Sequence, residues 1–551
     1  MGAHSLCVLI FLWPIFERQR LLLEEFRVKF SGRVRAVVAG CAMAAAIPGW
    51  SLRSAAQEQV TVDAKAPTTP FPHFWEEMFG SGRAILTLRE SYRNDLRAVK
   101  KVTDFKYVRF HAILHDEVGV YNEDEHGNPV YNFAYVDQIY DGLLKEGVRP
   151  VVEISFMPKK LAFNPDALHP FWYKQNVSPP KSMERWDGLM KAFGQHLVDR
   201  YGIDEVSQWY FEVWNEPNID FWNGIPRLES YLELYAHTAR TLKSVNPRIR
   251  VGGPATAQAA WVGDMIAHAT QNDVPLDFVS THVYGNDSTK DVFHDDRPMA
   301  PHQMVCAAVD KVHEEIAKSA KPQIPLIWSE FNATYMNEQA ITDSIYMGPW
   351  LADTISKCDG KTLMMSYWSF SDVFEEQGVV KTPFYGGYGI VAEDGVPKPA
   401  YDVFMLLHEL GDERLQAPKD EALVTRRKDG TIVIAVWNLV EPNAQGSGAE
   451  GADKTVTFDV YGVGPFQPQA HHGVAALEIK TTRAEVRRVD QTHGDTLDEW
   501  RRIGSPAWPT EDQIDLLRKA SELGPPEELP IHGHRLTLTL PPMGLAVVEI
   551  K

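Results

Sequence analysis

The chain has 551 residues, which is enough for two or three domains. Its 44% hydrophobic and 23% charged residues are typical of a folded globular protein. The formal net charge of −19 argues against nucleic acid or an anionic membrane as a partner, because both carry negative charge.

The first 56 residues resemble a leader more than a part of the fold. Arg33 and Arg35 precede an apolar run at 36–47, and the small residues 54–56 follow, which is the order of a secretory signal. We therefore expect the signal-like segment near 33–56 to direct export to the periplasm or the medium. If this segment is not used, the protein is cytoplasmic. In its mature form we expect no contact with a membrane.

From 71 to 410 the sequence alternates between strand-like and helix-like segments. Strands are expected near 78–84, 106–111, 150–154, 209–216, 249–252, 278–282, 324–330 and 363–369. Helices are expected near 133–146, 183–201, 228–245, 260–270, 304–318, 341–357 and 401–410. Eight repeated βα units predict parallel strands in a (β/α)₈ TIM barrel of the α/β class. A doubly wound open sheet is the alternative, but no Gly-rich phosphate loop follows any strand.

After residue 410 the pattern changes to a period of two. The segments 431–438, 455–460, 476–480, 535–540 and 545–550 predict a C-terminal antiparallel β-sandwich domain over 411–551. Residues 57–70 are expected to add an N-terminal strand to it. Thr510 begins a capping box with Gln513, so a short helical insertion is expected within 509–523.

The four cysteines do not form a disulfide framework. Cys7 and Cys41 lie in the leader, which leaves Cys306 and Cys358 in the body of the chain. We expect these two to be unpaired core thiols, with a single bridge as the alternative. No Cys/His cluster has the spacing of a zinc site, so no metal or other cofactor is expected.

Polar and aromatic side chains gather where the predicted strands end. The carboxyl ends of the strands build the active site of a (β/α)₈ barrel, so these residues are expected to meet there. They are His111, Glu153, Asn215, Glu216, His282, Glu330 and Trp368.

Glu216 and Glu330 suit the two roles of retaining glycoside hydrolysis. One carboxylate attacks the anomeric carbon, while the other gives a proton to the leaving oxygen. Pro217 is expected to favour an extended backbone at Glu216, and Asn215 is well placed to bind a sugar 2-hydroxyl. The alternative is that each glutamate caps or salt-bridges a loop.

Two short motifs, Asn215-Glu216-Pro217 and Trp328-Ser329-Glu330, carry a resemblance. They look like those of (β/α)₈ retaining glycosidases with the acid/base on strand four and the nucleophile on strand seven. More narrowly, the chain resembles glycoside hydrolase family 39, the β-xylosidases and α-L-iduronidases, from about residue 60 to the C-terminus. Further matching segments are 71–76, 80–83, 107–111, 156–158, 209–218, 281–284, 367–372, 398–401 and 504–506.

This resemblance implies roles for individual residues. Glu216 becomes the proton donor and acid/base, and Glu330 the nucleophile. The −1 subsite is expected to contain His111, Asn215, His282, Tyr284 and Trp368. Further candidates are Phe374, Glu375 and Glu376 after strand eight, where one glutamate would bind a sugar hydroxyl. Candidates for outer subsites are the aromatic residues Trp172, Tyr173, Phe221, Trp222 and Tyr385, with core or loop packing as the alternative for each. Glu153 is expected to be structural, below the site.

The expected substrate follows from one departure from the iduronidase pattern. Iduronidases look as if they bind the uronate carboxylate with a Lys at the position that Tyr284 occupies here. We therefore expect a β-D-xylosidase that releases xylose from the non-reducing ends of xylo-oligosaccharides. The alternatives are α-L-arabinopyranosidase, β-galactosidase, β-glucosidase or α-L-iduronidase activity, a non-catalytic carbohydrate-binding protein, and a metallohydrolase. Whether the chain forms a homo-oligomer is left open.

Overall fold

The computed structural model describes residues 56–416, 422–443, 451–463 and 483–551. The leader cysteines, the predicted strand at 476–480 and all of the signal-like segment except Ala56 lie outside these residues. Among the helices that are described, none is long and apolar enough to cross a membrane.

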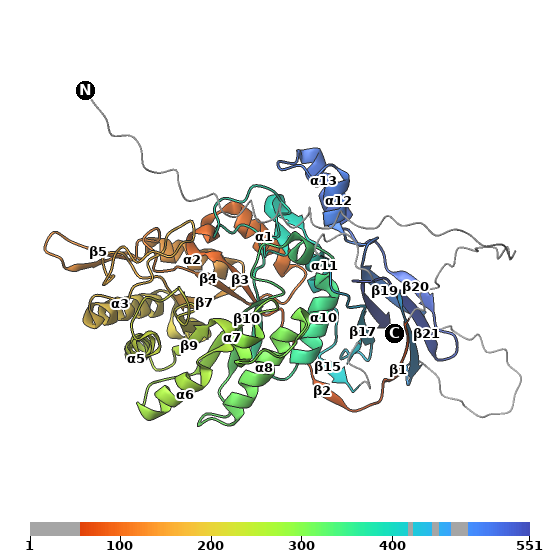
Figure 1. Cartoon of the computed structure of the whole chain (residues 1–551), viewed down its shortest axis with the longest axis horizontal. Helices are drawn as coiled ribbons and strands as arrows, with labels where there is room; N and C mark the ends of the chain where they lie inside the picture. The colour runs from red at the N-terminus through yellow and green to blue at the C-terminus, as the bar shows by residue number, and fades with distance from the viewer. Residues whose placement is uncertain (1–55, 417–421, 444–450, 464–482) are drawn as a thin grey trace, which may run out of the picture. The chain divides into compact units, whose positions relative to one another are not determined.

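Eight parallel strands close into a barrel, as the repeated βα units predict. Each strand pairs with the next one along the barrel, and the last pairs with the first. Figure 1 shows the strands at the centre of a ring of helices. The strands are β3 (Met78–Arg83), β4 (Tyr107–His111), β7 (Arg149–Ile154), β8 (Tyr210–Val213), β9 (Arg250–Thr256), β10 (Phe278–Tyr284), β11 (Leu326–Asn332) and β12 (Met364–Tyr367).

A helix follows each barrel strand. These are α1 (Glu90–Lys100), α2 (Ala134–Lys145), α3 (Met183–Tyr201), α5 (Arg227–Val245), α6 (Val262–Gln271), α8 (Pro301–Ala317), α10 (Met347–Cys358) and α11 (Pro399–His408). Shorter elements in the loops are α4 (Ile203–Val206), α7 (Thr289–Phe293), α9 (Gln339–Thr342) and the strand pairs β5 (Tyr121–Glu123) with β6 (Pro129–Tyr131) and β13 (Val391–Ala392) with β14 (Val396–Pro397).

The barrel interior changes from apolar to polar along the strands. Near the strand starts, a buried cluster forms the floor: Met78, Val151, Tyr210, Phe278, Ile327 and Met364. Side chains two residues apart on a strand share a face, so the next inward layer is Gly80, Glu153, Glu212, Ser280, Ser329 and Ser366. A layer of small and acidic side chains above an apolar floor leaves room for a buried polar network below the barrel mouth.

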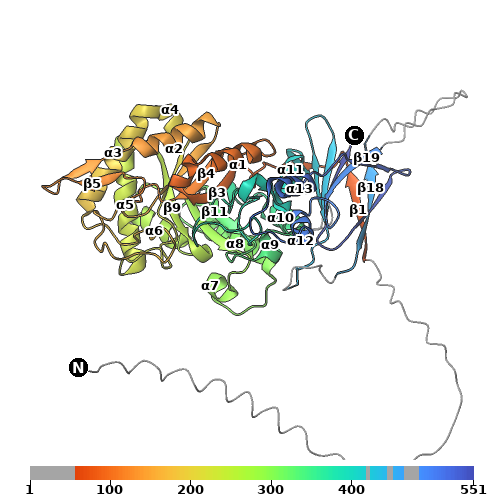
Figure 2. The ribbon, with the colours of Figure 1, turned by 90° about the horizontal axis from the view of Figure 1, so that it is seen from above.

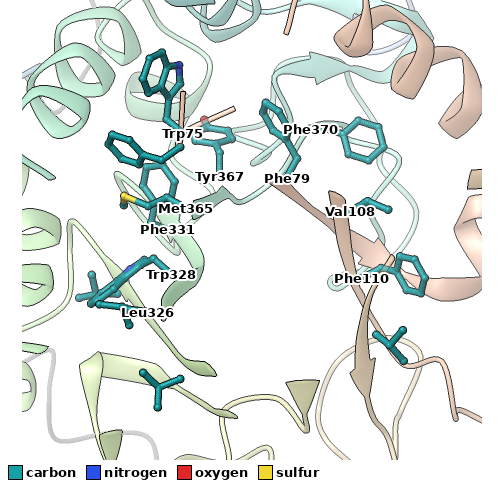
Figure 3. Close-up of a cluster of buried hydrophobic side chains, with 14 of the residues drawn as sticks. Trp75, Phe79, Val108, Phe110, Leu326, Trp328, Phe331, Met365, Tyr367 and Phe370 are labelled. Atoms are coloured by element: carbon teal, nitrogen blue, oxygen red, sulfur yellow. The ribbon is translucent and has the colours of Figure 1, made fainter. Parts of the chain in front are cut away.

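The intervening strand residues form the layer between the barrel and its helices. Phe79, Val108, Phe110 and Trp328 are all fully buried in the largest hydrophobic cluster. Figure 3 shows this cluster with its large aromatic side chains. Burial on both faces explains why these strands are nearly continuous apolar runs.

The C-terminal strands form two sheets. A seven-stranded sheet has the order β2 (Thr68–Pro70), β15 (Glu413–Leu415), β16 (Ala422–Arg426), β17 (Ile432–Trp437), β22 (Leu545–Ile550), β19 (Arg483–Val489) and β20 (Glu527–Pro530). A three-stranded sheet has the order β1 (Ala56–Asp63), β18 (Lys454–Tyr461) and β21 (Arg535–Leu540). Aliphatic residues of both sheets share one buried cluster.

The segment before the barrel contributes a strand to each sheet. β1 lies among strands from the far end of the chain (Figures 1 and 2) and pairs with β18 in parallel, whereas the other strand pairs in these two sheets are antiparallel within the described residues. Two helices, α12 (Thr496–Arg502) and α13 (Glu511–Ala520), interrupt the sandwich. Thr510 and Gln513 form the expected capping box at the start of α13.

One predicted helix is wrong. Residues 341–357 do not form a single helix, because the chain breaks between α9 and α10. Asp343 lies at the break, where its carboxylate accepts a hydrogen bond from the Gly386 amide at 2.7 Å and pairs with Lys398 at 2.7 Å. Both of these partners come from a distant segment of the chain, so nothing in the local sequence marks the interruption.

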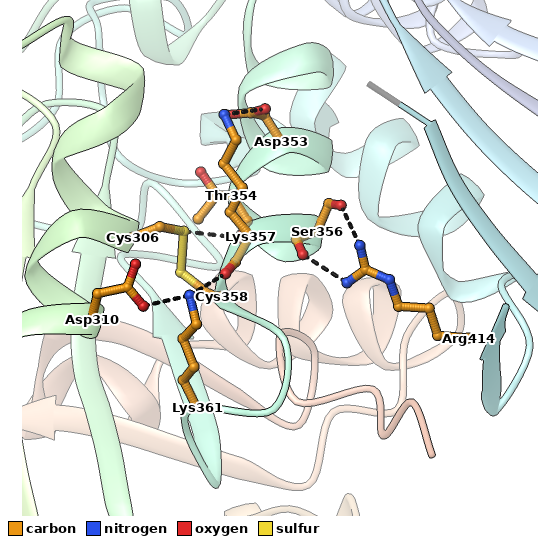
Figure 4. Close-up of a disulfide and its surroundings, with 9 residues drawn as sticks. All are labelled: Cys306, Asp310, Asp353, Thr354, Ser356, Lys357, Cys358, Lys361 and Arg414. Carbon is orange, nitrogen blue, oxygen red and sulfur yellow. Dashed lines mark hydrogen bonds and ion pairs between the residues drawn. A yellow bond between two sulfur atoms is a disulfide. The ribbon is translucent and has the colours of Figure 1, made fainter. Parts of the chain in front are cut away.

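The expectation of two unpaired cysteines is also wrong. Cys306 of α8 and Cys358 at the end of α10 form a buried disulfide (Figure 4). The two helices pack side by side in the ring, which brings together residues 52 positions apart in sequence. Beside the bridge, Arg414 of β15 donates to the Ser356 carbonyl at 2.7 Å and thereby ties the end of α10 to the sandwich.

We expect the disulfide to stabilise the protein measurably. Closing a loop of this length is worth about 2–4 kcal/mol, largely by restricting the unfolded chain. The double variant Cys306→Ser/Cys358→Ser should therefore melt roughly 2–5 °C below the wild type in calorimetry without reductant. The matched control is wild-type protein that has been reduced with dithiothreitol while unfolded and is then measured in the same reductant. Its melting temperature should fall toward that of the variant. Equal melting temperatures for wild type and variant without reductant would contradict the bridge.

Candidate active site

A cavity of about 310 Å³ opens at the carboxyl ends of the barrel strands. Its size is within the range of small-molecule sites. Eight of the predicted site residues line it: His111, Asn215, Glu216, Phe221, Tyr284, Glu330, Trp368 and Glu376. The structure thus brings both glutamates of the sequence motifs into one cavity, although 114 residues separate them.

Glu216 stands on a sharp turn after β8. The strand ends at Val213, and the backbone at Trp214 and Glu216 has φ values of 72° and 43°. The expected extended conformation at Glu216 is therefore wrong, since positive φ lies outside the extended region. The Glu216 amide donates to the Ala255 carbonyl at 2.8 Å, which holds the turn. Such sparsely populated backbone conformations cluster at functional sites.

Glu330 is held by donors that favour its charged form. Arg109 Nη1 lies 2.5 Å from Oε1, and the Tyr284 hydroxyl donates to Oε2 at 2.7 Å. Only 4% of Glu330 is exposed. Each carboxylate oxygen therefore has one strong donor, and the group is fixed in orientation.

Arg109 is a functional residue that the sequence-based prediction missed. It is fully buried and donates to Glu212 at 2.5 Å, to Asn215 Oδ1 at 2.9 Å and to Glu330, and it also pairs with Glu153 at 2.8 Å. One cation therefore orients the residues around the nucleophile candidate. The signal was present, because a charged residue two positions before His111 must face the barrel interior.

Glu216 has a different set of neighbours. His282 Nδ1 lies 3.1 Å from its Oε1, and His282 Nε2 lies 3.0 Å from Ser329 Oγ. Burial, together with Arg109 and His111, holds the pKa of His282 well below its usual range, so the ring is neutral. His282 is fully buried and lies behind the cavity wall, so it contacts Glu216 rather than the cavity.

The electrostatics separate the two carboxyl groups. Burial, and then the nearby charge of Glu330, raises the pKa of Glu216 well above its usual range. Burial raises the pKa of Glu330 too, but Arg109, His111 and the Tyr284 hydrogen bond oppose the rise. Glu330 therefore loses its proton before Glu216, and the pair holds one acid and one anion.

The two carboxylates are close together. One oxygen of each, with a nitrogen of His282, lie within 4.8 Å of one another. Retaining glycosidases keep their carboxyl groups about 5–5.5 Å apart, whereas inverting enzymes need about 6.5–9.5 Å to admit a water. The separation favours direct attack by one carboxylate.

His111 and Trp368 form one side of the cavity next to Glu330. His111 Nδ1 lies 2.7 Å from Glu153, while Nε2 faces Glu376 at 3.8 Å. The rings of His111 and Trp368 lie 4.7 Å apart. Trp368 fits because residue 80 is glycine: a Cβ there would lie 2.0 Å from the indole. Burial raises the pKa of Glu376 to about 8, so this carboxyl can be protonated near neutral pH.

Besides His282, which was expected in the −1 subsite, and the outer-subsite candidates Tyr173 and Tyr385, four predicted residues do not line the cavity. Phe374 packs behind Trp368, and Glu375 pairs with Arg83 and Arg89. Trp222 is buried against Trp214, with its indole nitrogen donating to Ser230 at 3.0 Å, and Trp172 is 54% exposed on the rim near Arg83. Glu153 is buried beneath His111 and Arg109 and does not reach the cavity either.

Several wall residues were not predicted at all. They come from loops, where neither periodicity nor a strand end marks them: His169, Phe171, Gln258, Asp287, Tyr335 and Tyr388. Asp287 accepts a hydrogen bond from the Tyr284 amide at 2.8 Å, and burial raises its pKa to about 6.

In the described part of the chain, two groups of side chains bring together residue types that can bind a metal ion. In one, Glu216, His282 and Glu330, a cation would lie close to the charge of Arg109, which opposes binding. In the other, His73, Glu76 and His408, nitrogens lie 2.6 and 2.8 Å from the same carboxylate oxygen, which is hydrogen-bond geometry. Neither arrangement calls for a metal.

Comparisons with known proteins agree with this geometry. The family model of glycosyl hydrolases family 39 matches residues 58–533. A β-xylosidase from Geobacillus stearothermophilus is 35% identical over 460 residues, 82% of this chain and 86% of that protein. A β-xylosidase from Caldicellulosiruptor saccharolyticus is also 35% identical over 460 residues, 82% of this chain and 88% of its own. The crystal structure of a monomeric β-xylosidase from Caulobacter crescentus CB15 matches with a TM-score of 0.79 at 31% identity, covering 90% of this chain and 99% of that one.

Proposed function

The chain belongs to glycosyl hydrolase family 39, and from this premise we propose that it is a retaining exo-β-D-xylosidase. It releases xylose from the non-reducing ends of xylo-oligosaccharides. The observation that carries the mechanism is the pair of carboxylates within 4.8 Å, one stabilised as an anion and the other as an acid.

The reaction proceeds in two displacements. Glu330 attacks the anomeric carbon while Glu216 gives its proton to the leaving oxygen, so a xylosyl ester forms and the aglycone departs as an alcohol. Glu216 then takes a proton from water, whose oxygen attacks the same carbon and frees Glu330. The anomeric configuration is inverted twice and is therefore retained.

Hydrogen-bonding groups around Glu330 bind the xylosyl ring. Asn215, oriented by Arg109, is placed for the 2-hydroxyl, where a bond strengthens in the transition state. His111 and Glu376 offer polar atoms on the same wall, and Trp368 offers a flat apolar face. His282 positions Glu216 from behind.

A neutral sugar fits this cavity better than a uronic acid. Among the described residues that line it there is no Lys or Arg, whereas Glu216, Glu330, Glu376 and Asp287 are all acidic. Tyr284 stands at the position where an iduronidase would have Lys. Its hydroxyl donates a hydrogen bond to Glu330, so this position offers no cation to the carboxylate of a uronic acid. A uronate carboxylate would find no cation in this lining to offset the loss of its water, and the charge of Glu330 would oppose it.

The stereochemical course tests this function. During early hydrolysis of 4-nitrophenyl β-D-xyloside, ¹H NMR should show β-xylose first and α-xylose only as mutarotation proceeds. On a panel of nitrophenyl glycosides, the xyloside should have the highest kcat/KM and the glucuronide and iduronide the lowest. Initial release of α-xylose would contradict the retaining mechanism.

We expect Tyr284→Phe to reduce kcat/KM for the xyloside about 10- to 100-fold, because a hydrogen bond to a charged group is lost. The lost donor also raises the pKa of Glu330. Since Glu330 must be ionised to attack, the acidic limb of the pH profile should move to higher pH. Tyr335→Phe is the control, since its ring lies 6.0 Å from that of Tyr284 but no described bond joins it to either carboxylate. An unchanged acidic limb in Tyr284→Phe would contradict this role.

We also propose that the protein is exported through the signal-like segment near 33–56. A buried disulfide supports this, because such bridges persist mainly in oxidising compartments. Fractionation of cells producing the full chain should place xylosidase activity outside the cytoplasm. A chain that starts at residue 57 should stay inside, and equal distribution of the two would contradict export.

A further inference from the structure

A buried lysine binds two segments of the chain together next to the cavity wall. Lys398 immediately precedes α11, and its side chain is fully buried. Its ammonium lies 2.7 Å from the carboxylate of Asp343, between α9 and α10, and 2.5 Å from that of Asp372, in the loop after β12. Both carboxylates are fully buried as well. None of the three groups lines the cavity, and none takes part in the two displacements.

Burying three charged groups together is costly. Burial disfavours the ammonium, but Asp343 and Asp372 outweigh this effect and raise the pKa of Lys398. Burial also raises the pKa of Asp372 to about 6, although Lys398 opposes the rise. Buried ion pairs stabilise a fold little more than apolar side chains of the same volume, whereas removal of one partner is strongly unfavourable. The arrangement that this cluster fixes is therefore more informative than its contribution to stability.

The cluster binds three backbone groups within four residues of the loop after β12. Lys398 donates to the Gly387 carbonyl at 2.9 Å. The amides of Gly386 and Gly389 each donate to one of the two carboxylates at 2.7 Å. A Cβ at Gly387 would clash with a carboxylate oxygen of the cluster, so the close approach requires glycine. These three groups flank Tyr388, whose backbone is thus held on both sides.

Tyr388 connects the cluster to the cavity. It lines the cavity and packs edge-on against Phe374 at 5.4 Å, and Phe374 in turn packs against Trp368 at 5.7 Å. The Tyr388 hydroxyl donates to the Tyr335 carbonyl at 2.7 Å, which joins the loops after β11 and β12. The Tyr388 carbonyl accepts from the Ser369 amide at 3.0 Å, directly after Trp368. A shift of Tyr388 would therefore disturb the apolar wall of the cavity.

We propose that Lys398 is a positioning residue for substrate binding. Together with Asp343 and Asp372 it fixes the backbone of 386–389 and thereby holds Tyr388 in the cavity wall. Lys398 acts through Tyr388 and touches neither the substrate nor the two catalytic carboxylates. This inference rests on the proposed glycosidase function, and it adds a buried group outside the cavity on which binding of the substrate depends.

The split between KM and kcat tests this role. Lys398→Met removes the cation and keeps a side chain of similar length. KM for 4-nitrophenyl β-D-xyloside should rise about 5- to 10-fold, because the wall binds the substrate and the transition state alike. The kcat should stay within about 3-fold, since no hydrogen bond within the described residues joins Tyr388 to either catalytic carboxylate.

A second variant perturbs the same loop and leaves every charge in place. In Gly387→Ala the new Cβ displaces the loop from Asp372. KM should again rise about 5- to 10-fold with little change in kcat. Because no buried charge loses its partner, this variant tests the proposal even if Lys398→Met does not fold.

A double-mutant cycle separates positioning from a general loss of structure. In a Tyr388→Ala background, Lys398→Met should change KM by no more than about 2-fold, because the side chain through which it acts is absent. Lys454→Met is the matched control. Lys454 is also buried and pairs with a carboxylate, that of Glu58 at 3.1 Å, but it belongs to β18 of the sandwich. This variant should lower the melting temperature and leave KM unchanged.

Hydrogen exchange gives a readout that does not depend on the reaction. The amides of Gly386 and Gly389 should exchange about 10-fold faster in Lys398→Met, because their acceptors lose the cation that orients them, and at the wild-type rate in Lys454→Met. Mass spectrometry of peptides that cover 384–391 measures these rates.

Three results would overturn the positioning role. They are a wild-type KM in both Lys398→Met and Gly387→Ala, additive effects of Lys398→Met and Tyr388→Ala on KM, and unchanged exchange of the two glycine amides. A wild-type enzyme that cleaves no xyloside, while the difference in exchange remains, would instead overturn the glycosidase function.

Discussion

Replacing Glu330 by alanine is expected to lower kcat/KM for 4-nitrophenyl β-D-xyloside by about 10⁴-fold or more, since no other group can form the xylosyl ester. The fold should survive, because Arg109 keeps two other carboxylate partners, Glu153 and Glu212. Added azide should enter the vacated space and attack from the same side, so the product is α-xylosyl azide. Steady-state kinetics, a melting curve and NMR of the azide adduct measure these effects.

Glu212→Gln is the matched control for this variant. Glu212 binds Arg109 at 2.5 Å, as Glu330 does, but it does not line the cavity. Its loss weakens the support of Arg109 and leaves the nucleophile in place, so kcat/KM should fall by no more than about 100-fold. Equal losses in the two variants would mean that Glu330 acts only through Arg109 and is not the nucleophile.

Replacing Glu216 by alanine should give an effect that depends on the leaving group. Xylobiose needs a proton on its leaving oxygen, so its kcat/KM should fall about 10³- to 10⁴-fold. Dinitrophenolate leaves without a proton, so the rate of the first step with 2,4-dinitrophenyl xyloside should fall much less. Azide should now attack the xylosyl ester from the face opposite Glu330 and give β-xylosyl azide. The opposite configurations of the two azides distinguish the acid from the nucleophile.

The pH profile provides a further test of Glu216. The acid must be protonated, so the wild-type rate falls as pH rises through the raised pKa of Glu216. The nucleophile must be ionised, so the rate also falls as pH drops below the pKa of Glu330. With the dinitrophenyl substrate, Glu216→Ala should lose the alkaline limb and keep the acidic one. A variant that keeps the alkaline limb would contradict the role of Glu216 as the acid.

The sequence predicted the barrel and a pair of glutamates at its mouth because both leave local signals. In the sequence, Glu216 and Glu330 each end an apolar run, where a carboxylate is unusual unless it serves a site at the barrel mouth. Arg109 is likewise a charged residue within an apolar run, two residues before His111, so the same reasoning could have identified it. Its partners could not, because they come from three other strands, β7, β8 and β11, and from the turn after β8.

The features that escaped prediction depend on contacts between distant segments. The helix predicted over 341–357 is interrupted near Asp343, whose carboxylate pairs with Lys398, 55 residues later. Cys306 and Cys358 pair because two helices of the ring pack together. Trp222 and Phe221 are neighbours in sequence, yet only Phe221 lines the cavity, and nothing local distinguishes them. Aromatic residues in loops serve as core or as binding surface according to the tertiary fold alone.

Covalent trapping tests the central claim most directly. 2,4-Dinitrophenyl 2-deoxy-2-fluoro-β-D-xyloside should inactivate the enzyme with release of one equivalent of dinitrophenol, because the fluorine slows breakdown of the glycosyl ester. Mass spectrometry of the digested protein should place the fluoroxylosyl group on the peptide that contains Glu330. Inactivation without a covalent adduct, or an adduct on any other residue, would contradict the assignment.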